Sequence, residues 1–318
     1  METREFGRLG RISALTLGGG GIGGVWGSTD RAEAVATIHA ALDAGITMLD
    51  LAPGYGVDSE SERAAGEALR SRAAADLMIT TKIPLPDDEG DVRARARRSL
   101  HDSLERIGRD HVDLVLLHTQ LRPRSGRSDE PGLIGWPVYR DEVIGEFERF
   151  RAEGLIGGWG ITGVGHPDSV VDALAEAPKP DAVQVVVNAM DMNGDIWFFE
   201  DVAPATEAIL TAANRNGVPV VGIRAVAAGS LTSAVDRPLP DGHPAARDFA
   251  RAEPFRKLAA ELGETPAALA HRYALSVPGV ATVVLGVKNR AELAECVAAA
   301  ERGPLTAAEM TAIRALTA

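Results

Sequence analysis

Short apolar runs alternate along the chain with longer segments in which apolar residues recur every three or four positions. Continuous apolar runs of this length are typical of strands that are buried on both faces, as in a parallel sheet. Eight runs of four to six residues carry no charged side chain and predict eight strands: Ala14–Leu17, Ile46–Leu49, Leu77–Thr81, Leu114–Leu117, Ile156–Ile161, Ala182–Val187, Val218–Ile223 and Ala281–Leu285.

The segments between these runs have the spacing and the end signals of helices. Asp30 and Glu33 form a capping-box pattern typical of a helix start, and Gly45 is a typical helix end. Ser59 and Glu62 repeat the start pattern before the next helix. Further helices are predicted at Val92–Ile107, Val143–Ala152, Asp168–Ala177, Pro204–Asn216, Pro266–Val277 and Ala291–Ala300.

Eight strands, each followed by a helix, predict a single-domain α/β barrel of the (β/α)8 type over residues 1–318. The length suits this fold, because such barrels commonly run to roughly 200–400 residues as one domain. We also expect a short β-hairpin near Phe6–Ile12 to cover the bottom of the barrel, and a C-terminal helix within Thr306–Leu316. A doubly wound open sheet is the alternative, although it rarely needs eight regular units.

Three long loops interrupt this rhythm, at Leu121–Pro137, Asn188–Val202 and Leu231–Pro244. Each follows a strand and precedes a helix, so all three are expected on the C-terminal face, where barrel active sites are built. Aromatic residues in or near the loops are candidates for a substrate pocket, with core packing as the alternative: Trp26, Trp136, Trp197 and Phe198. Arginines of the first loop could meet an anionic substrate, although solvated surface charge is the favoured interpretation: Arg122, Arg124 and Arg127.

Polar residues stand at the ends of three successive predicted strands. Asp50, Lys82 and His118 each follow directly after an apolar run, and Tyr55 lies in the loop after Asp50. Lys82 is one of only four lysines in a chain with 29 arginines, so the overall composition does not explain a lysine at this position. If the barrel is right, neighbouring strands bring all four side chains to one mouth. A structural ion pair and a hydrogen-bonded histidine are the alternative interpretation.

The chemistry of these four residues suits proton transfer. A free tyrosine has a pKa of ~10 and is a poor proton donor at neutral pH. An adjacent ammonium is expected to lower the pKa of Tyr55, and Asp50 is expected to hold Lys82 charged and oriented. His118 can hydrogen-bond a substrate carbonyl. The set is therefore suited to protonating an alkoxide as a hydride reaches a carbonyl carbon.

Over nearly its whole length the chain resembles the aldo-keto reductases. The resemblance implies a (β/α)8 barrel that binds an extended nicotinamide cofactor and reduces small-molecule carbonyls, and Asp50, Tyr55, Lys82 and His118 match the catalytic tetrad of that family. The segments that carry the resemblance are Phe6–Arg11, Leu17–Gly21, Ala41–Gly45, Leu49–Gly56, Ser59–Gly66, Thr80–Lys82, Val112–His118, Gly158–Thr162 and Gly286–Glu295.

The resemblance also implies where the cofactor binds. NADP(H) is expected in preference to NAD(H), because Lys288 lies where the resemblance puts the 2′-phosphate; Glu292 would oppose this if it faced inward, so NAD(H) remains open. Three positions depart from the family pattern: Gly163 stands where asparagine is usual, Arg224 where a tyrosine that stacks on the nicotinamide is common, and Cys296 where an asparagine often contacts the adenine. The resemblance implies that Thr162 and Gln184 contact the carboxamide and that Ala227–Leu231 contains the pyrophosphate loop. The full set of implied cofactor contacts is Thr162, Gln184, Arg224, Gly229, Leu231, Gly286, Lys288, Asn289 and Glu295.

Composition and motifs exclude several other classes of function. The net charge of −12 argues against nucleic-acid and anionic-membrane partners, because both need a basic surface. A single cysteine excludes an intramolecular disulfide and a cysteine-based zinc site, and no histidine spacing predicts a metal. No signal peptide or membrane helix is recognisable, so a cytoplasmic location is expected. Gly19–Gly24 fits a dinucleotide-binding glycine pattern, but the next helix begins near Asp30, which favours a barrel-mouth loop.

Two other functions remain open from the sequence. The chain could be a cofactor-binding regulatory subunit with little turnover, since the β-subunits of potassium channels resemble the same family. It could also be a barrel lyase or isomerase that needs no nicotinamide. The substrate and the oligomeric state cannot be derived from these residues.

Overall fold

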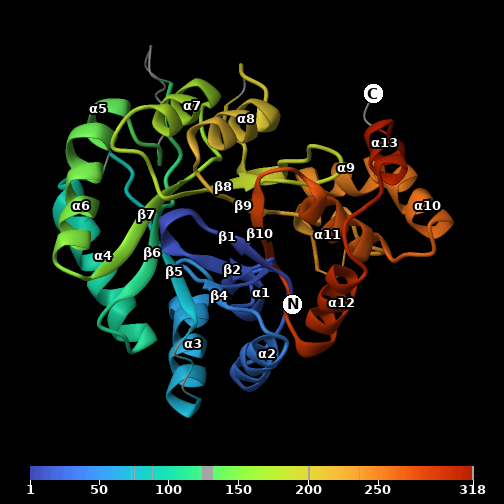
Figure 1. The fold of residues 1–318 in the computed structure, drawn as a ribbon, viewed down its shortest axis with the longest axis horizontal. Helices are drawn as coiled ribbons and strands as arrows, with labels where there is room; N and C mark the ends of the chain where they lie inside the picture. The colour runs from blue at the N-terminus through green and yellow to red at the C-terminus, as the bar shows by residue number, and fades with distance from the viewer. Residues whose placement is uncertain are drawn as a thin grey trace.

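The computed structural model describes residues 1–316 except 73, 75, 88, 124–131, 200 and 236. Eight parallel strands form a closed barrel in chain order, with the last strand hydrogen-bonded to the first (Figure 1). The barrel strands are β3 (Leu15–Gly18), β4 (Met48–Asp50), β5 (Met78–Ile83), β6 (Val112–Leu117), β7 (Ile156–Thr162), β8 (Ala182–Val186), β9 (Val220–Ile223) and β10 (Val280–Leu285). Each lies within two residues of a predicted run, so the predicted barrel is confirmed and the open sheet is wrong.

Helices surround the barrel, and most follow the predicted segments. Those that directly cover the strands are α2 (Arg31–Asp43), α3 (Glu60–Ser71), α4 (Val92–Ile107), α6 (Ile144–Ala152), α7 (Pro167–Ala175), α8 (Thr206–Asn216), α11 (Pro266–Ser276) and α12 (Arg290–Glu301). Shorter helices at the mouth or the side are α1 (Gly19–Ile22), α5 (Trp136–Val138), α9 (Pro244–Arg251), α10 (Glu253–Glu261) and α13 (Ala307–Arg314).

The two predicted capping boxes are not formed as such. Asp30 does accept a hydrogen bond from the backbone N of Glu33 at 2.8 Å, but the Glu33 carboxylate binds Arg290 instead. Ser59 has a left-handed backbone with φ of 60° and makes no capping bond. The Glu62 carboxylate turns inward to other partners. In both predicted capping boxes the glutamate carboxylate therefore binds residues of other elements instead of the backbone at its own helix start.

The predicted hairpin at the bottom of the barrel is present. Strands β1 (Thr3–Glu5) and β2 (Arg11–Ser13) pair antiparallel around the turn. Phe6 and Ile12 are buried and pack with inward residues of the barrel strands such as Met48, Leu114 and Val221. Apolar side chains thus fill the lower part of the barrel, and polar side chains are left to its other end.

A second apolar cluster lies beside the barrel, and neither α10, which contributes to it, nor the neighbouring α9 was predicted from the sequence. Helices α9, α10 and α13 gather at one side of the molecule (Figure 1). Phe255 of α10 and Ile313 of α13 are fully buried, and they pack with Met190 and Met192 from the loop after β8. The predicted C-terminal helix is confirmed, and it holds this cluster together.

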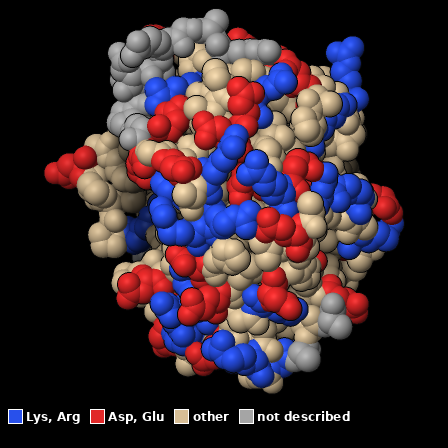
Figure 2. All heavy atoms as spheres, turned by 90° about the vertical axis from the view of Figure 1, so that its left-hand side faces the viewer, with Lys and Arg blue, Asp and Glu red and all other residues tan. Residues whose placement is uncertain are grey.

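The outer surface between α4 and α6 mixes the two signs of charge. Helices α4 and α6 lie at the left of Figure 1, and the face seen from that side carries interspersed basic and acidic side chains (Figure 2). Arg97 of α4 binds both Glu146 and Glu153, each at 2.8 Å. Arg97 of the arginine-rich stretch is therefore paired with acids in and just after α6. Among the described residues, no helix is both long and apolar enough to cross a membrane.

Candidate active site

Asp50 and Lys82 form a buried ion pair at the C-terminal end of the barrel. Lys82 Nζ donates to Asp50 Oδ1 at 2.8 Å and to the backbone oxygen of Leu51 at 2.8 Å. Both charged side chains are at most 2% exposed. Gln184 Nε2 on β8 donates to the same Asp50 oxygen on β4 at 2.9 Å, so these side chains meet inside the barrel. A buried charge must be paired in this way, because its desolvation is otherwise too costly.

Tyr55 and His118 complete the group predicted from the sequence. The Tyr55 ring centroid lies 4.6 Å from Lys82 Nζ and 5.9 Å from the His118 ring, which stands nearly perpendicular to it. Backbone N of His118 continues the β5–β6 ladder by donating to the oxygen of Ile83 at 2.9 Å. The structure thus brings all four predicted catalytic candidates together at one mouth.

Burial and neighbouring charges shift the pKa values of Lys82, Tyr55 and His118. Burial lowers the pKa of Lys82, but Asp50 and Tyr55 raise it by more, so the lysine stays charged. Burial raises the pKa of Tyr55 above its ordinary value, and Lys82 opposes this shift without reversing it. The expected lowering of the Tyr55 pKa is therefore wrong in its net direction. Burial, with the nearby Lys82 charge, lowers the pKa of His118 to about 3, so its imidazole is neutral.

A glycine-rich turn holds the Tyr55 loop against the barrel. A Cβ at Gly23 would lie 2.6 Å from the backbone oxygen of Tyr55, and one at Gly56 would lie 2.1 Å from the oxygen of Gly23. On the other side, Ser61 N donates to the Tyr55 oxygen at 3.1 Å and Ser61 Oγ to the oxygen of Ala52 at 3.1 Å. The glycines after β3 thus permit close backbone packing beside the candidate proton donor.

Glu62 is a buried acid beside the site that the sequence analysis assigned only to a helix cap. Its side chain is fully buried, and it accepts hydrogen bonds from Thr81 Oγ1 and Arg106 Nε, both at 2.6 Å. Thr81 directly precedes Lys82 on β5. The first turn of α3 therefore ties down both the Tyr55 loop and the strand that carries Lys82.

Two residues implied as carboxamide contacts lie close together, on paired strands. Thr162 of β7 pairs in register with Gln184 of β8, and Thr162 Oγ1 accepts from Val164 N at 3.2 Å. Gln184 makes the bond to Asp50 described above. Gly163 has no room for the asparagine of the family pattern, because a Cβ there would lie 2.7 Å from the backbone oxygen of Gln184.

The turn after β9 has an unusual backbone. Ala227, Ala228 and Gly229 have successive φ values of 47°, 54° and 95°, in the short helix η5 (Ala227–Gly229). Left-handed backbone is unfavourable for residues with a Cβ, and such turns can present N–H groups to an anion. Leu231 is buried just behind this turn. The turn is the segment that the resemblance assigns to the cofactor pyrophosphate.

Arg224 connects three loops above the mouth. It also has a left-handed backbone, with φ of 55°. Its Nη1 donates to Asn193 O at 3.2 Å and to Asp195 Oδ1 at 2.9 Å, both in the loop after β8. Its guanidinium lies 5.6 Å from the Trp26 ring centroid, and Arg237 lies 5.5 Å from the same ring. Trp26 is thus held at the mouth between two cations.

The other aromatic candidates are divided between core and mouth loops. Trp136 is buried and packs on Tyr139, so core packing explains it. Trp197 donates from Nε1 to the oxygen of Phe199 at 2.8 Å, within the loop after β8. Phe198 in the same loop is 46% exposed.

The arginines of the loop after β6 were candidates for binding an anionic substrate. Arg122 binds Asp87 at 2.9 Å, whereas Arg124 and Arg127 lie outside the described residues.

In the segment after β10, Lys288 and Asn289 both contact the carboxylate of Glu292. Lys288 Nζ lies 2.8 Å from Glu292 Oε1, and Asn289 Nδ2 donates to the same oxygen at 3.3 Å. Glu295 instead accepts from Thr265 Oγ1. A Cβ at Gly286 would lie 3.3 Å from the Trp26 ring, which brings this segment next to the mouth. Cys296, the third departure, is buried against His271, and burial raises the pKa of its thiol.

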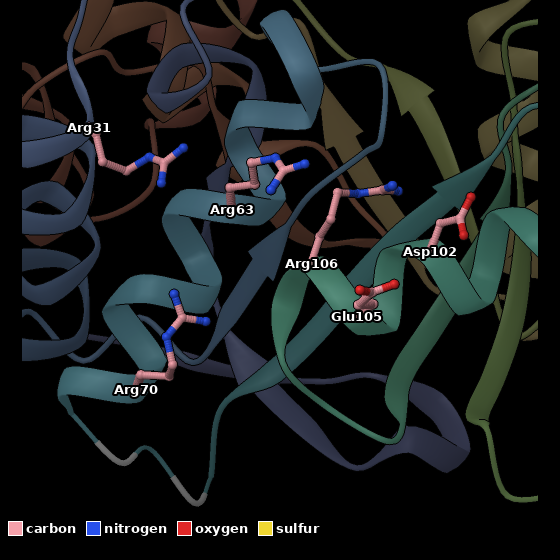
Figure 3. Close-up of a pocket in the computed structure, with 6 residues that line it drawn as sticks. All are labelled: Arg31, Arg63, Arg70, Asp102, Glu105 and Arg106. Carbon is pink, nitrogen blue, oxygen red and sulfur yellow. The ribbon is translucent and has the colours of Figure 1, made fainter.

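Two cavities lie around α2 and α3. One, of about 460 Å³, is lined by the loop between α1 and α2, whose Thr29 donates to Lys288 O at 2.9 Å. The other, of about 330 Å³, is a groove on the outside of the barrel (Figure 3). Arg31 pairs there with Glu60 and Arg106 with Glu62, and none of the four candidate catalytic residues lines it. The residues that line this groove are Arg31, Arg63, Arg70, Asp102, Glu105 and Arg106.

Comparisons with known proteins agree with this geometry. The Aldo/keto reductase family model matches residues 14–318. L-galactose dehydrogenase of Arabidopsis thaliana is 27% identical over 304 residues, which cover 94% of this chain and 88% of that protein. A putative voltage-gated potassium channel β-subunit of Schizosaccharomyces pombe is 26% identical, with the same two coverages. The solved holo form of an aldo-keto reductase from Bacillus halodurans has a TM-score of 0.74 and 25% identity, covering 100% of this chain and 97% of that one. The chain therefore belongs to the aldo/keto reductase family.

Proposed function

We propose that this chain transfers a hydride between a nicotinamide dinucleotide and an aldehyde or ketone, with Tyr55 as the proton donor. The observation that carries the proposal is the group around Lys82: a charged, fully buried lysine bound to Asp50 and next to a tyrosine. A structural ion pair alone does not need a phenol and an imidazole at the same mouth. Family membership supports the reaction class.

The residues at the mouth suit a dinucleotide. Arg224 and Arg237 bring two cations to the segment after β9, in a chain of net charge −12. Such a donor set, beside a left-handed turn, fits the negative charges of a pyrophosphate. Thr162 and Gln184 offer a hydroxyl and an amide on adjacent strands, which suits a carboxamide. When bound, the dinucleotide supplies the hydride for the carbonyl carbon.

Each of the four candidate catalytic residues then has its own role in the transfer of the proton. Tyr55 gives its phenolic proton to the carbonyl oxygen. Its raised pKa keeps the phenol protonated at neutral pH, and the Lys82 charge, which opposes that rise, favours release of the proton to the developing alkoxide. Lys82 stabilises the phenolate that remains, while Asp50 holds Lys82 in place. His118 is neutral, so one of its ring nitrogens can donate a hydrogen bond to the same carbonyl oxygen. Hydride and proton together convert the carbonyl into an alcohol.

The relatives suggest which substrates to screen and which alternative functions to test. The Arabidopsis relative is named for L-galactose, so sugar lactols belong in a substrate screen beside simple aldehydes and ketones. The yeast relative is named as a channel subunit, which keeps a regulatory role as the second candidate. A regulatory subunit would bind the dinucleotide but turn over no carbonyl. A lyase or isomerase would not bind it.

The test combines binding with turnover. The full chain is titrated with NADPH and with NADH by calorimetry, and each reduced cofactor is then followed by absorbance with a panel of aldehydes, ketones and lactols. The expected result is binding, followed by carbonyl-dependent oxidation of the cofactor that Tyr55→Phe slows by about 10²–10⁴. Binding without turnover on any carbonyl would favour the regulatory role. The preference for NADP(H) depends on Lys288 reaching a 2′-phosphate, and Glu292 competes for that lysine.

A further inference from the structure

Lys288 and Asn289, directly before α12, both contact the Glu292 carboxylate. Lys288 Nζ and Asn289 Nδ2 contact Oε1, at 2.8 and 3.3 Å, and Lys288 backbone N donates to Oε2 at 2.9 Å. Asn289 Oδ1 in turn accepts from Glu292 N at 3.0 Å and caps the helix. The acid is therefore held in place by the very groups that were expected to bind a phosphate.

Other cations near this segment are also paired. Arg290 binds Glu33 through its backbone N at 2.9 Å and its guanidinium at 2.9 Å. Arg31, which lines the neighbouring cavity, pairs with Glu60 and Glu67. An incoming phosphate would have to take a cation from a carboxylate and then remain beside that carboxylate.

We infer that Glu292 sets the cofactor preference and favours a dinucleotide with a free 2′-hydroxyl, NAD(H), over one with a 2′-phosphate. This inference rests on the proposed function, which places the adenosine ribose beside Lys288. A 2′-phosphate carries close to two negative charges, and the Glu292 carboxylate repels it. A 2′-hydroxyl instead donates to the carboxylate and leaves the Lys288–Glu292 pair intact. The preference for NADP(H) expected from the sequence is thereby reversed.

The variant Glu292→Gln removes the negative charge of the side chain and keeps its size, so it tests whether the charge sets the cofactor preference. Glutamine has the same size, keeps one oxygen for Lys288 N and removes the negative charge that Glu292 places beside the Lys288 ammonium. A charge-assisted hydrogen bond from Lys288 to a 2′-phosphate corresponds to an affinity gain of about tenfold or more. Glu301→Gln is the matched control, because it removes an exposed carboxylate from the other end of the same helix.

The experiment measures dissociation constants by calorimetry, without any substrate. NADH, NADPH, 5′-AMP and 2′,5′-ADP are titrated into the wild type and both variants. We expect the wild type to bind NADH at least as tightly as NADPH. Glu292→Gln should tighten NADPH and 2′,5′-ADP about tenfold while changing NADH and 5′-AMP little. The double variant Lys288→Ala with Glu292→Gln should lose this gain, because the lysine then no longer meets the phosphate.

The outcomes separate the inference from the proposed function. A wild type that binds NADPH much more tightly than NADH would overturn the inference and leave the proposed function standing. An unchanged affinity ratio in Glu292→Gln, or an equal change in Glu301→Gln, would do the same. A correctly folded wild type that binds neither dinucleotide would overturn both.

Discussion

Replacing Tyr55 by phenylalanine removes a single oxygen from the candidate active site and leaves its packing in place. The ring keeps its position over Lys82, with 4.6 Å between Nζ and the ring centroid, and its perpendicular contact with His118. Lys82 keeps its bonds to Asp50 and to the oxygen of Leu51. The variant is therefore expected to fold and to bind cofactor as the wild type does.

The loss in rate follows from the role proposed for the phenol. A positioned general acid contributes about 10²–10⁴ in rate, which corresponds to roughly 3–5 kcal/mol of activation free energy. Water does not replace the missing proton donor well, because the neighbouring Lys82 is fully buried and His118 is neutral at working pH. We expect kcat to fall by that factor while the Kd of the cofactor stays the same.

The assay is single-turnover oxidation of bound reduced cofactor by a verified carbonyl substrate, with cofactor Kd measured separately. Tyr139→Phe is the matched control, because the Tyr139 hydroxyl is buried and has no hydrogen-bond partner among the described residues. That change should leave the rate unaltered and raise stability by about 1 kcal/mol, since an unsatisfied buried polar group is removed. A Tyr55→Phe rate near that of the wild type would refute the proposed proton donor. Equal losses in both variants would point to a structural effect.

Three further predictions concern pH, backbone strain and the buried acid. The rate of carbonyl reduction should show no step near pH ~6.5, because the pKa of His118 is about 3; a step there in a pH–rate profile would contradict the neutral imidazole. Ala228→Gly should raise the melting temperature, since it relieves a left-handed residue at φ of 54° worth about 1 kcal/mol, and a lower value by calorimetry would count against that strain. Thr81→Val should lower unfolding free energy in urea by about 1–3 kcal/mol, because Glu62 loses a partner. Thr80→Val is its control, since the Thr80 hydroxyl has no partner among the described residues; equal losses would rule out the Glu62 explanation.

The barrel and the cluster at its mouth were predictable because two simple regularities coincide. Uncharged runs of strand length recur eight times, and a closed parallel barrel is the fold that buries such runs on both faces. In parallel strands, residues just past each run meet at one end of the barrel, so Asp50, Lys82 and His118 had to be neighbours. Neither step needs the identity of a distant partner.

Features that depend on a distant partner were not predictable. Ser59 and Glu62 have the spacing of a capping box, but Glu62 finds Thr81 and Arg106 from other elements and leaves the helix end. The pKa of Tyr55 shows the same limit. Its basic neighbour could be derived from the sequence, whereas the depth of burial that outweighs this neighbour belongs to the folded molecule.

The cofactor segment is the sharpest case, because its residues allow opposite conclusions. Lys288 and Glu292 are four residues apart at a helix start, a spacing at which the two side chains can either meet or diverge. If they diverge, the lysine is available to a phosphate and NADP(H) is favoured. In the structure they meet, and Lys288 N and Asn289 bind the same carboxylate, so the lysine is already neutralised. A charge that is present in the sequence therefore attracts a ligand only when the fold leaves it without an internal counter-ion, and at this helix start the fold supplies one.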